Sequence, residues 1–209
     1  MSEASIHYYE PAQGHGLTHD PFKAIIGPRP IGWIASRSKQ GLINLAPYSF
    51  FNAFCDKPPI IGFASSGWKD TVRNIEETDE FVWNLATKPL AEAMNLTSTA
   101  VPPEVNEFEL AGLTQAPCRQ VKVPRVAESP VSMECRLLQI IQLRDKNGQA
   151  LDNWLTLGEV IGVHIDRAFL DNNIYQTATA HPILRAGRTG DYVEITPDTM
   201  FEMARPTSR

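Results

Sequence analysis

The chain has 209 residues, 43% of them hydrophobic, and 19 Lys and Arg stand against 24 Asp and Glu, which gives a net charge of −5. This composition is typical of a folded globular protein and argues against intrinsic disorder and against nucleic-acid binding by general phosphate attraction. No run of about 18 apolar residues is present, so no membrane-spanning helix is expected, and the 16 prolines disfavour a helical bundle.

The first half of the chain is dominated by strand signals. Residues Pro30–Ser36 and Leu42–Ala46 flank a polar turn that contains a glycine, Arg37–Gly41, which is typical of a β-hairpin. The segment Pro59–Ala64 is apolar and too short for a helix, so it is predicted to be a buried strand. Pro47 removes one ladder N–H from a strand pattern, and we expect the backbone there to leave the sheet.

Three further strands are predicted farther along the chain. Glu80–Ala86 alternates apolar and polar residues, and Val131–Arg144 contains a long apolar run. Asn147-Gly148 follows it and favours a type I′ turn with two positive-φ residues, which predicts a hairpin with Trp154–Asp166. That last strand contains two glycines suited to a bulge or a tight barrel corner, Gly158 and Gly162.

Few helices are predicted. Asp70–Thr78 has apolar residues at helical spacing, and Pro89–Leu96 and Thr196–Met203 each begin with a proline in the first turn. The segment Val101–Pro130 is rich in proline, and we expect a long loop with at most one short helix. Six strands separated by turns and short helices predict a small antiparallel barrel in a single domain that spans residues 1–209.

The segment Ser65–Thr71 has the clearest chemistry. A strand ends there in two hydroxyls, and a helix begins after Lys69. Helix N-termini offer unpaired N–H groups and a partial positive charge, so these residues together can hold a phosphate. The alternative is a plain strand–turn–helix capped by Ser66 or Asp70, whose carboxylate would compete for the same N–H groups. The spacing of a P-loop is absent.

Two other segments carry unusual residues. Arg29 lies between two prolines, ahead of a strand that ends in the hydroxyl of Ser36. The next segment contains Tyr48, Phe50 and Phe51, which belong either to the core or to the wall of a cofactor site, the core being the commoner place for aromatic side chains. No GxSxG elbow and no nucleophile–base pair is visible, which disfavours a hydrolase, and no catalytic residue is assigned.

Cysteine and histidine spacings point to no metal site. The three cysteines, Cys55, Cys118 and Cys135, are odd in number and widely spaced, which fits neither a disulfide framework nor a zinc knuckle. His15 and His19 are four residues apart, but the glycines and proline around them disfavour a helix. The first residues lack the basic start and apolar stretch of a secretory signal. We therefore expect a cytoplasmic protein with idle thiols and no metal.

Several motifs follow one another from about Tyr8 to Tyr192. They are PRPIGWI at residues 28–34, NLAPYSFFN at 44–52, KDT at 69–71, FVWNLA at 81–86, GEVIGVH at 158–164 and HPILR at 181–185. In this order and spacing they resemble the flavin reductase family of FMN-binding split barrels. Trp68 departs from the family pattern, because a small or polar residue is expected there.

The resemblance implies a mainly β fold, a six-stranded antiparallel split β-barrel of Greek-key type with a few short flanking helices. It also implies a homodimer with FMN near the dimer interface, the isoalloxazine along residues 34–36 and 44–52, and the phosphate at Ser65–Thr71. Ser49 or nearby backbone N–H groups are expected at flavin N5, and Arg29 or Arg185 on the N1–O2 side. The candidate FMN-binding residues are Arg29, Ile34, Ala35, Ser36, Asn44, Ala46, Pro47, Tyr48, Ser49, Asn52, Ser65, Ser66, Lys69, Asp70, Thr71 and Asn74.

The function implied by the resemblance is an oxidoreductase that transfers hydride from NADH or NADPH to N5 of FMN, with a monooxygenase or another electron acceptor as partner. Two alternatives stay open, a flavoredoxin-like electron-transfer flavoprotein and an FMN-binding module without turnover. No GxGxxG fingerprint follows a strand, so the sequence does not distinguish NADH from NADPH. It also leaves open whether FMN is a bound cofactor or an exchanging substrate.

Overall fold

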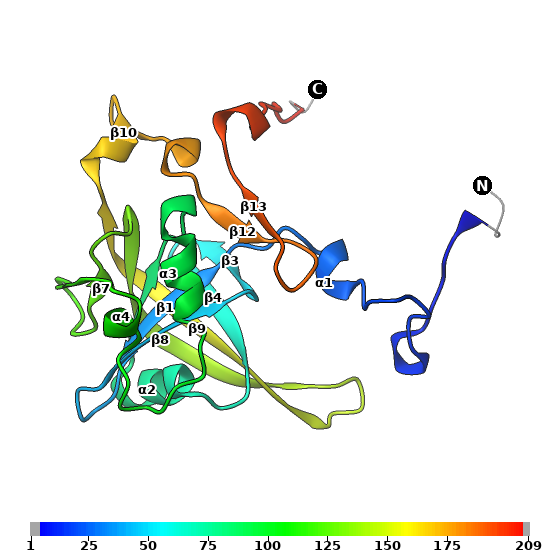
Figure 1. The fold of residues 1–209 in the computed structure, drawn as a ribbon. Helices are drawn as coiled ribbons and strands as arrows, with labels where there is room; N and C mark the ends of the chain where they lie inside the picture. The colour runs from blue at the N-terminus through cyan, green and yellow to red at the C-terminus, as the bar shows by residue number, and fades with distance from the viewer. Residues whose placement is uncertain (1–4, 207–209) are drawn as a thin grey trace.

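A computed structural model describes residues 5–206 and centres on one antiparallel sheet of seven strands (Figure 1). The strands follow the spatial order β2-β1-β5-β8-β9-β4-β3. Their bounds are β1 Gly32–Arg37, β2 Ile43–Tyr48, β3 Phe51–Asp56, β4 Pro59–Ser66, β5 Glu80–Asn84, β8 Val131–Arg144 and β9 Ala150–Ile165. The strands at the two ends of this order, β2 and β3, are consecutive in the chain and are joined by residues 49 and 50.

Short elements decorate the sheet. The α-helices are α1 Phe22–Ile25, α2 Asp70–Thr78, α3 Ala91–Leu96 and α4 Glu107–Leu110, and 3-10 turns lie at Pro11–Gln13, Lys88–Leu90, Arg167–Phe169, Thr177–Ala180 and Pro197–Thr199. Three two-stranded pairs are β6 Gln115–Ala116 with β7 Arg125–Val126, β10 Leu170–Asp171 with β11 Ile174–Tyr175, and β12 Ile183–Arg185 with β13 Tyr192–Glu194. Within the described residues, no helix combines the length and the apolar character needed to cross a membrane.

Strand β1 is buried on both faces and so joins two hydrophobic clusters. Successive strand residues point to opposite faces, so Trp33 packs with Met94 of α3 and Phe108 of α4. Its neighbour Ile34 points the other way, into the cluster that contains Ile75 of α2. The β1 strand is therefore held between the α3–α4 side and the α2 side of the molecule.

The predicted hairpins and the predicted helix Asp70–Thr78 are confirmed. Strand β1 pairs with β2 in antiparallel register, and β8 pairs with β9 through the turn that contains Asn147 and Gly148. Helix α2 begins and ends at the predicted residues. The β8–β9 register shifts beside Gly158 and beside Gly162, as expected for bulges. The segment 101–130 is mostly loop, with one short helix.

Pro47 corrects one prediction. It does not leave the sheet but lies inside β2, opposite Trp33 of β1. Strand β2 stands at one end of the strand order, so the missing N–H of the proline interrupts no ladder there. Strand β3 begins three residues after the last residue of β2, and it was not predicted. Five of its six residues are exposed, so it lacks a buried alternating face. Strand β3 follows β2 directly in the chain and adds one strand to the predicted set. The six-stranded barrel therefore stays a prediction.

Two local predictions are wrong in detail. The Asn147-Gly148 turn has a positive φ only at Gly148, because Oδ1 of Asp145 accepts the N–H groups of Asn147 and Gln149 and stabilises a different turn. The predicted helix Thr196–Met203 is only the 3-10 turn Pro197–Thr199, and Phe201 beyond it is 81% exposed. A helix gains most of its stability from packing, which this segment lacks.

Other boundaries shift slightly. The predicted helix Pro89–Leu96 begins with a 3-10 turn over Lys88–Leu90 and becomes α-helical at Ala91. The arm before β1 projects from one side of the sheet, with α1 at its base (Figure 1). The single domain over residues 1–209 stays a prediction, and residues 1–4 and 207–209 lie outside the described part of the chain.

Gly158 provides a test of how closely the sheet packs. A Cβ at this position would lie 2.3 Å from Cε1 of Phe81, a fully buried ring. Gly158→Ala is therefore expected to lower the free energy of unfolding by about 1–3 kcal/mol, the usual effect of overpacking, as measured by urea denaturation. Gly190→Ala is the control, since a Cβ at that position would meet no heavy atom within 4 Å. Equal unfolding midpoints for the two variants would contradict this packing.

Candidate functional site

A cleft of about 570 Å³ lies where the end of β2, the first turn of α2 and the segment after α3 meet. This volume is in the range of small-molecule sites. Nine of the predicted binding residues line it, namely Asn44, Ala46, Pro47, Tyr48, Ser49, Ser66, Lys69, Asp70 and Thr71. The fold thus brings together the two segments that the sequence separates by about twenty residues.

The first turn of α2 has free N–H groups. Gly67, with a φ of +89°, turns the chain between β4 and the helix, and Ser65 Oγ donates a hydrogen bond of 2.8 Å to its carbonyl oxygen. Lys69 is the N-cap residue, and its side chain does not cap the helix. The Asp70 carboxylate pairs with Arg73 instead. No hydrogen bond of the described residues uses the N–H groups of residues 70–72, so they face the cleft region unpaired.

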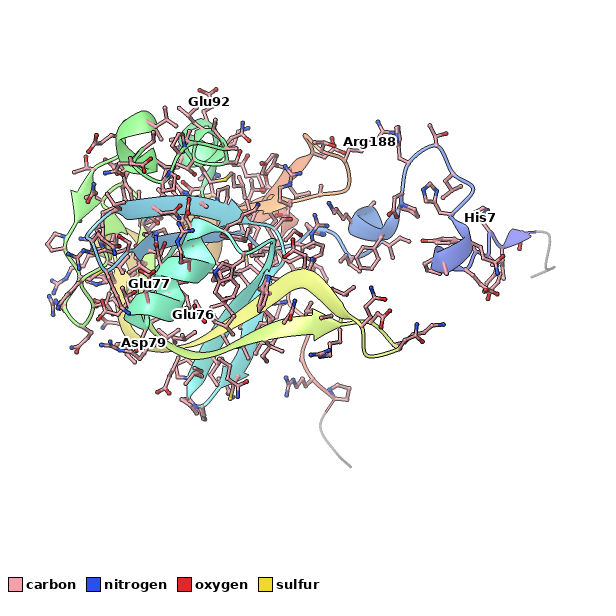
Figure 2. The ribbon with its side chains drawn as sticks, turned by 90° about the horizontal axis from the view of Figure 1, so that it is seen from below. His7, Glu76, Glu77, Asp79, Glu92 and Arg188 are labelled. Carbon is pink, nitrogen blue, oxygen red and sulfur yellow. The ribbon has the colours of Figure 1, made fainter. Side chains whose placement is uncertain are left out.

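The charges on α2 are distributed in favour of an anion at this turn. Lys69 is exposed and has no ion-pair partner among the described residues. The acidic residues Glu76, Glu77 and Asp79 lie at the opposite end of the helix (Figure 2). Acids near a helix C-terminus are unfavourable by about 0.3–1 kcal/mol each, so this arrangement does not serve helix stability. It does keep these three carboxylates away from the first turn, where the one acidic residue, Asp70, is paired with Arg73.

Tyr48 places an unpaired hydroxyl in the same region. Its side chain is 7% exposed, and its Oη is one of three buried side-chain atoms in the described chain without a hydrogen-bond partner. Burial raises the pKa of Tyr48 to about 12, and the neighbouring hydroxyls of Thr71 and Ser65 act in the opposite direction. These two hydroxyls are therefore close to the phenol, although neither forms a well-directed hydrogen bond with it. The phenol keeps its proton at neutral pH and can donate it.

Thr71 is oriented by the neighbouring strand. Its Oγ1 accepts a hydrogen bond of 2.8 Å from Nδ2 of Asn44 on β2. This leaves the hydroxyl proton of Thr71 free to donate in another direction. Glu107 from α4 closes the same side of the cleft, and its Oε2 accepts the N–H of Leu45 at 3.0 Å. Burial, with a smaller contribution from Asp70, raises the pKa of Glu107.

A second hollow of about 340 Å³ adjoins the cleft and shares Pro47, Tyr48 and Ser49 with it. Its far wall contains Arg185 and Tyr192 from the β12–β13 pair, with the guanidinium carbon 4.6 Å from the ring centroid. No hydrogen bond or ion pair of the described residues occupies the Arg185 guanidinium. A positive charge is therefore available on this side of residues 47–49.

The guanidinium of Arg29 is engaged by backbone carbonyl oxygens. Its guanidinium donates to the carbonyl oxygens of Ser49 at 3.2 Å, of Ala186 at 3.4 Å and of Lys23. Burial and the nearby charge of Arg185 lower the pKa of Arg29. Its donors are thus used to join three segments of backbone. Arg29 fixes the position of Ser49, while Arg185 remains the freer of the two guanidinium groups.

Six of the other predicted residues lie away from the cleft. Ile34 and Ala35 are fully buried in the two core clusters. Ser36 accepts a hydrogen bond of 3.2 Å from Asn74 between β1 and α2, and both are buried. Ser65 is buried beneath its turn, and Asn52 is exposed on β3. These residues position the cleft from behind or beside it.

Part of the cleft lining was not predicted from the sequence. The segment after α3 contributes hydroxyls, α4 a carboxylate and the N-terminal arm a cation, in the residues Thr97, Ser98, Thr99, Glu107 and Lys23. The run of three hydroxyl residues at 97–99 was the one available signal. Trp68 does not line the cleft but packs edge-on against Trp154, with ring centroids 4.5 Å apart. Its bulk therefore leaves the first turn of α2 accessible.

Comparison with known proteins gives concordant matches. The profile of the flavin reductase like domain family matches residues 27–183, about three quarters of the chain. An uncharacterized protein of Aquifex aeolicus (strain VF5) is 39% identical over 161 residues, which are 73% of this chain and 79% of that protein.

Two crystal structures are also similar. Nitrilotriacetate monooxygenase component B from Bacillus cereus has a TM-score of 0.84 at 30% identity, over 95% of this chain and 98% of its own. The 2-nitrobenzoate 2-nitroreductase of Pseudomonas fluorescens has a TM-score of 0.79 at 27% identity, over 99% and 96% of the two chains.

Tyr48→Phe tests whether the buried hydroxyl has a protein partner. A buried hydroxyl without a hydrogen bond costs stability, so its removal is expected to raise the free energy of unfolding of the ligand-free protein by about 1 kcal/mol. The measurement is urea unfolding of protein freed of small molecules. Tyr8→Phe, at a side chain that is 79% exposed, is the control and should leave the value unchanged. A loss of stability in Tyr48→Phe would show that the hydroxyl is already paired.

Proposed function

Because the chain belongs to the flavin reductase like domain family, we propose that it is an FMN-binding oxidoreductase, and specifically an NAD(P)H-dependent flavin reductase. The observation that carries the proposal is the group of unpaired donors at the first turn of α2. It consists of the N–H groups of residues 70–72, the buried hydroxyl of Tyr48 and the charge of Lys69. These donors fit a phosphate dianion, which accepts several hydrogen bonds at once.

The residues of the cleft fit the rest of FMN as well. Lys69, Thr71 and Tyr48 would hold the phosphate. The hydroxyls of Ser98 and Thr99 donate to carbonyl oxygens of α3 and lie along the same cleft, where their oxygens can accept hydrogen bonds from the polar ribityl chain. The adjoining hollow, with Pro47, Ser49 and Arg185 in its walls, would receive the ring. Glu107 also lines this cleft and disfavours an anion beside it, and its carboxylate is held by the N–H of Leu45.

FMN supplies the redox chemistry in this proposal, since its ring accepts and donates electrons. The residues of the chain would position the flavin and stabilise its charge. Arg29 holds the carbonyl of Ser49 and so fixes the backbone beside the hollow. Arg185 places a positive charge in the wall of the same hollow, where it would stabilise negative charge on a reduced flavin. We assign no proton transfer to any side chain.

The reductant is proposed to bind in a third hollow, of about 1120 Å³, between the N-terminal arm and the β12–β13 turn. It meets the second hollow at Ser49 and Arg185, and its lining also contains Lys23 and Arg188. Arg188 is labelled in Figure 2. None of these three cations has a side-chain ion pair among the described residues. Such a surface suits the anionic pyrophosphate of NADH or NADPH.

A homodimer is proposed on the basis of exposed apolar side chains. On β9, Val163 is 54% exposed, and Ile161 and Ile165 lie two residues before and after it. The three side chains therefore share one face of the strand. Phe54 on β3 is 56% exposed. Apolar groups gathered on a surface indicate an association site, and a second copy of the chain would cover them. The similarity to a monooxygenase component supports a monooxygenase as one electron acceptor, and the expected cytoplasmic location stays a prediction.

Anaerobic addition of NADH or NADPH to the FMN-loaded protein tests the function. We expect at least one of them to bleach the visible absorption of the flavin. Lys69→Ala with Thr71→Ala should raise the Kd for FMN at least about 100-fold, because charged hydrogen bonds contribute about 1.5–3 kcal/mol each. Lys146→Ala, at a distant turn, is the control. FMN binding without bleaching would contradict a reductase and favour an electron-transfer protein, and absence of FMN binding would contradict both.

Sedimentation equilibrium at micromolar concentration tests the dimer. The expected species has twice the chain mass of 23.3 kDa. Phe54→Asp should shift the equilibrium toward the monomer, because it buries a charge in the proposed interface. Ile174→Asp is the matched control, since Ile174 is 65% exposed on the separate β10–β11 pair. A wild-type protein that sediments only as the single chain would rule out the dimer.

A further inference from the structure

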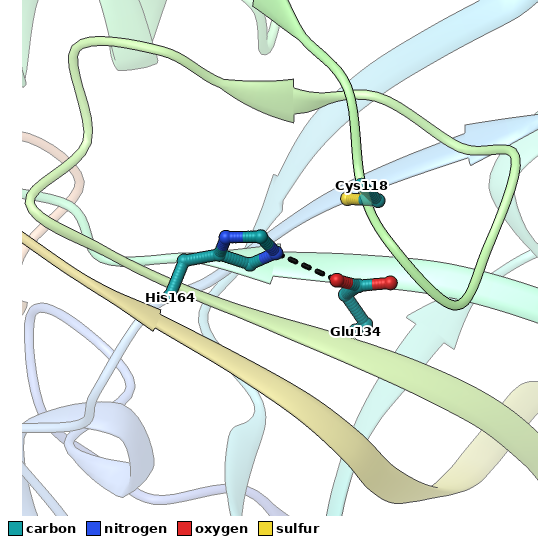
Figure 3. A group of neighbouring side chains, drawn as sticks. All are labelled: Cys118, Glu134 and His164. Atoms are coloured by element: carbon teal, nitrogen blue, oxygen red, sulfur yellow. Dashed lines mark hydrogen bonds and ion pairs between the residues drawn. The ribbon is translucent and has the colours of Figure 1, made fainter.

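A second cluster of reactive side chains lies apart from the proposed flavin site. Cys118 in the loop after β6, Glu134 on β8 and His164 on β9 converge, with their ligand atoms within 4.8 Å of one another (Figure 3). Glu134 and His164 line a hollow of about 970 Å³, which shares no lining residue with the flavin cleft. The proposed function makes no use of this cluster.

Glu134 is a preorganised anion in this cluster. Its side chain is 1% exposed, and its Oε2 accepts the N–H groups of Gln120 at 2.6 Å and Val121 at 3.0 Å. Burial opposes the charge, but these hydrogen bonds and those from Arg119 and His164 lower the pKa of Glu134 overall. Hydrogen bonds of this kind orient carboxylates that bind metals. Both oxygens are thus held by backbone, since Oε1 accepts the N–H of Arg119 at 3.0 Å, and Oε1 is also directed toward His164.

The remaining ligand atoms lie around Oε1. Nε2 of His164 is 2.6 Å from Oε1, and the Cys118 sulfur lies above this pair in Figure 3. Gly162 leaves room here, because a Cβ at that position would be 3.2 Å from Oε1. His164 is only partly buried and borders the hollow, so a water molecule can reach the cluster from that side.

We propose that Cys118, Glu134 and His164 bind a divalent transition-metal ion of the zinc type. One sulfur, one imidazole nitrogen and one carboxylate oxygen are a ligand set that zinc accepts, and a water from the hollow would complete four-coordination. The thiolate and the carboxylate balance the charge of the ion, which a largely buried site requires. On binding, the Cys118 thiol releases its proton to solvent, and the proton that Nε2 of His164 shares with Oε1 of Glu134 is exchanged for one on Nδ1, which leaves Nε2 free to bind the ion.

The ion would join three separate segments. Cys118 belongs to the long proline-rich loop, whereas Glu134 and His164 face each other from paired strands near Gly162. In the metal-free chain the loop is attached to Glu134 through backbone hydrogen bonds alone. Metal binding to the folded chain would add to this attachment and stabilise the fold. The role is therefore structural and independent of flavin binding.

Cobalt titration of the full-length, FMN-loaded protein after chelator treatment tests the site. Difference spectra should show one Co²⁺ per chain, with a thiolate charge-transfer band and the visible bands of four-coordinate cobalt, which Zn²⁺ abolishes. Cys118→Ser should lose the charge-transfer band and bind at least about 100-fold more weakly, because removal even of outer-shell partners costs 10–100-fold. Cys55→Ser, at the exposed thiol of β3, should bind as the wild type does.

Two results would overturn the site. One is a wild-type protein that takes up no Co²⁺ at millimolar concentration, which needs no variant and no assumption about its folding. The other is a Cys118→Ser protein that retains its FMN and circular dichroism yet binds Co²⁺ with unchanged affinity and spectrum. Retention of FMN in that variant also separates failure of the metal site from failure of the proposed flavin function.

Discussion

Ligand binding in this molecule depends on donors that the folded chain leaves unpaired. The N–H groups at the start of α2 and the buried hydroxyl of Tyr48 have no partner among the described residues. Buried polar groups without hydrogen bonds are costly, so a chain that retains several of them in one cleft gains stability when an acceptor binds. In the proposed function a phosphate would satisfy all of them together, and the positive charge of Lys69 would add to its binding.

The sheet brings these donors together. Strand β4 leads directly into the turn at Gly67 and the first turn of α2, and β2 carries Asn44 and Tyr48 to the same place. Asn44 then orients Thr71, and Arg29 fixes the backbone of Ser49 at the other end of β2. The cleft proposed for the phosphate and the hollow proposed for the ring therefore both border residues 47–49 at the end of one edge strand. The metal cluster proposed on β8 and β9 lies on separate elements.

The elements whose structure is determined by residues close in the sequence could be predicted from it. Helix α2 and the β1–β2 and β8–β9 hairpins follow from spacing and turn residues, whereas phosphate binding at residues 65–71 stays a prediction. The rest depends on tertiary contacts. Pro47 is compatible with β2 only because that strand ends the sheet order. Glu107 and residues 97–99 reach the cleft through the chain path, and Asp70 leaves the N–H groups free only because it pairs with Arg73.

The most direct test compares the dissociation constants of FMN and riboflavin for the same purified protein. The two flavins share a ring and a ribityl chain and differ only in the phosphate. If the donors at α2 are the main binding site, FMN should bind at least about 100-fold more tightly, since two charged hydrogen bonds suffice for that ratio. Equal dissociation constants for the two flavins would contradict the account, because the phosphate would then contribute nothing to binding.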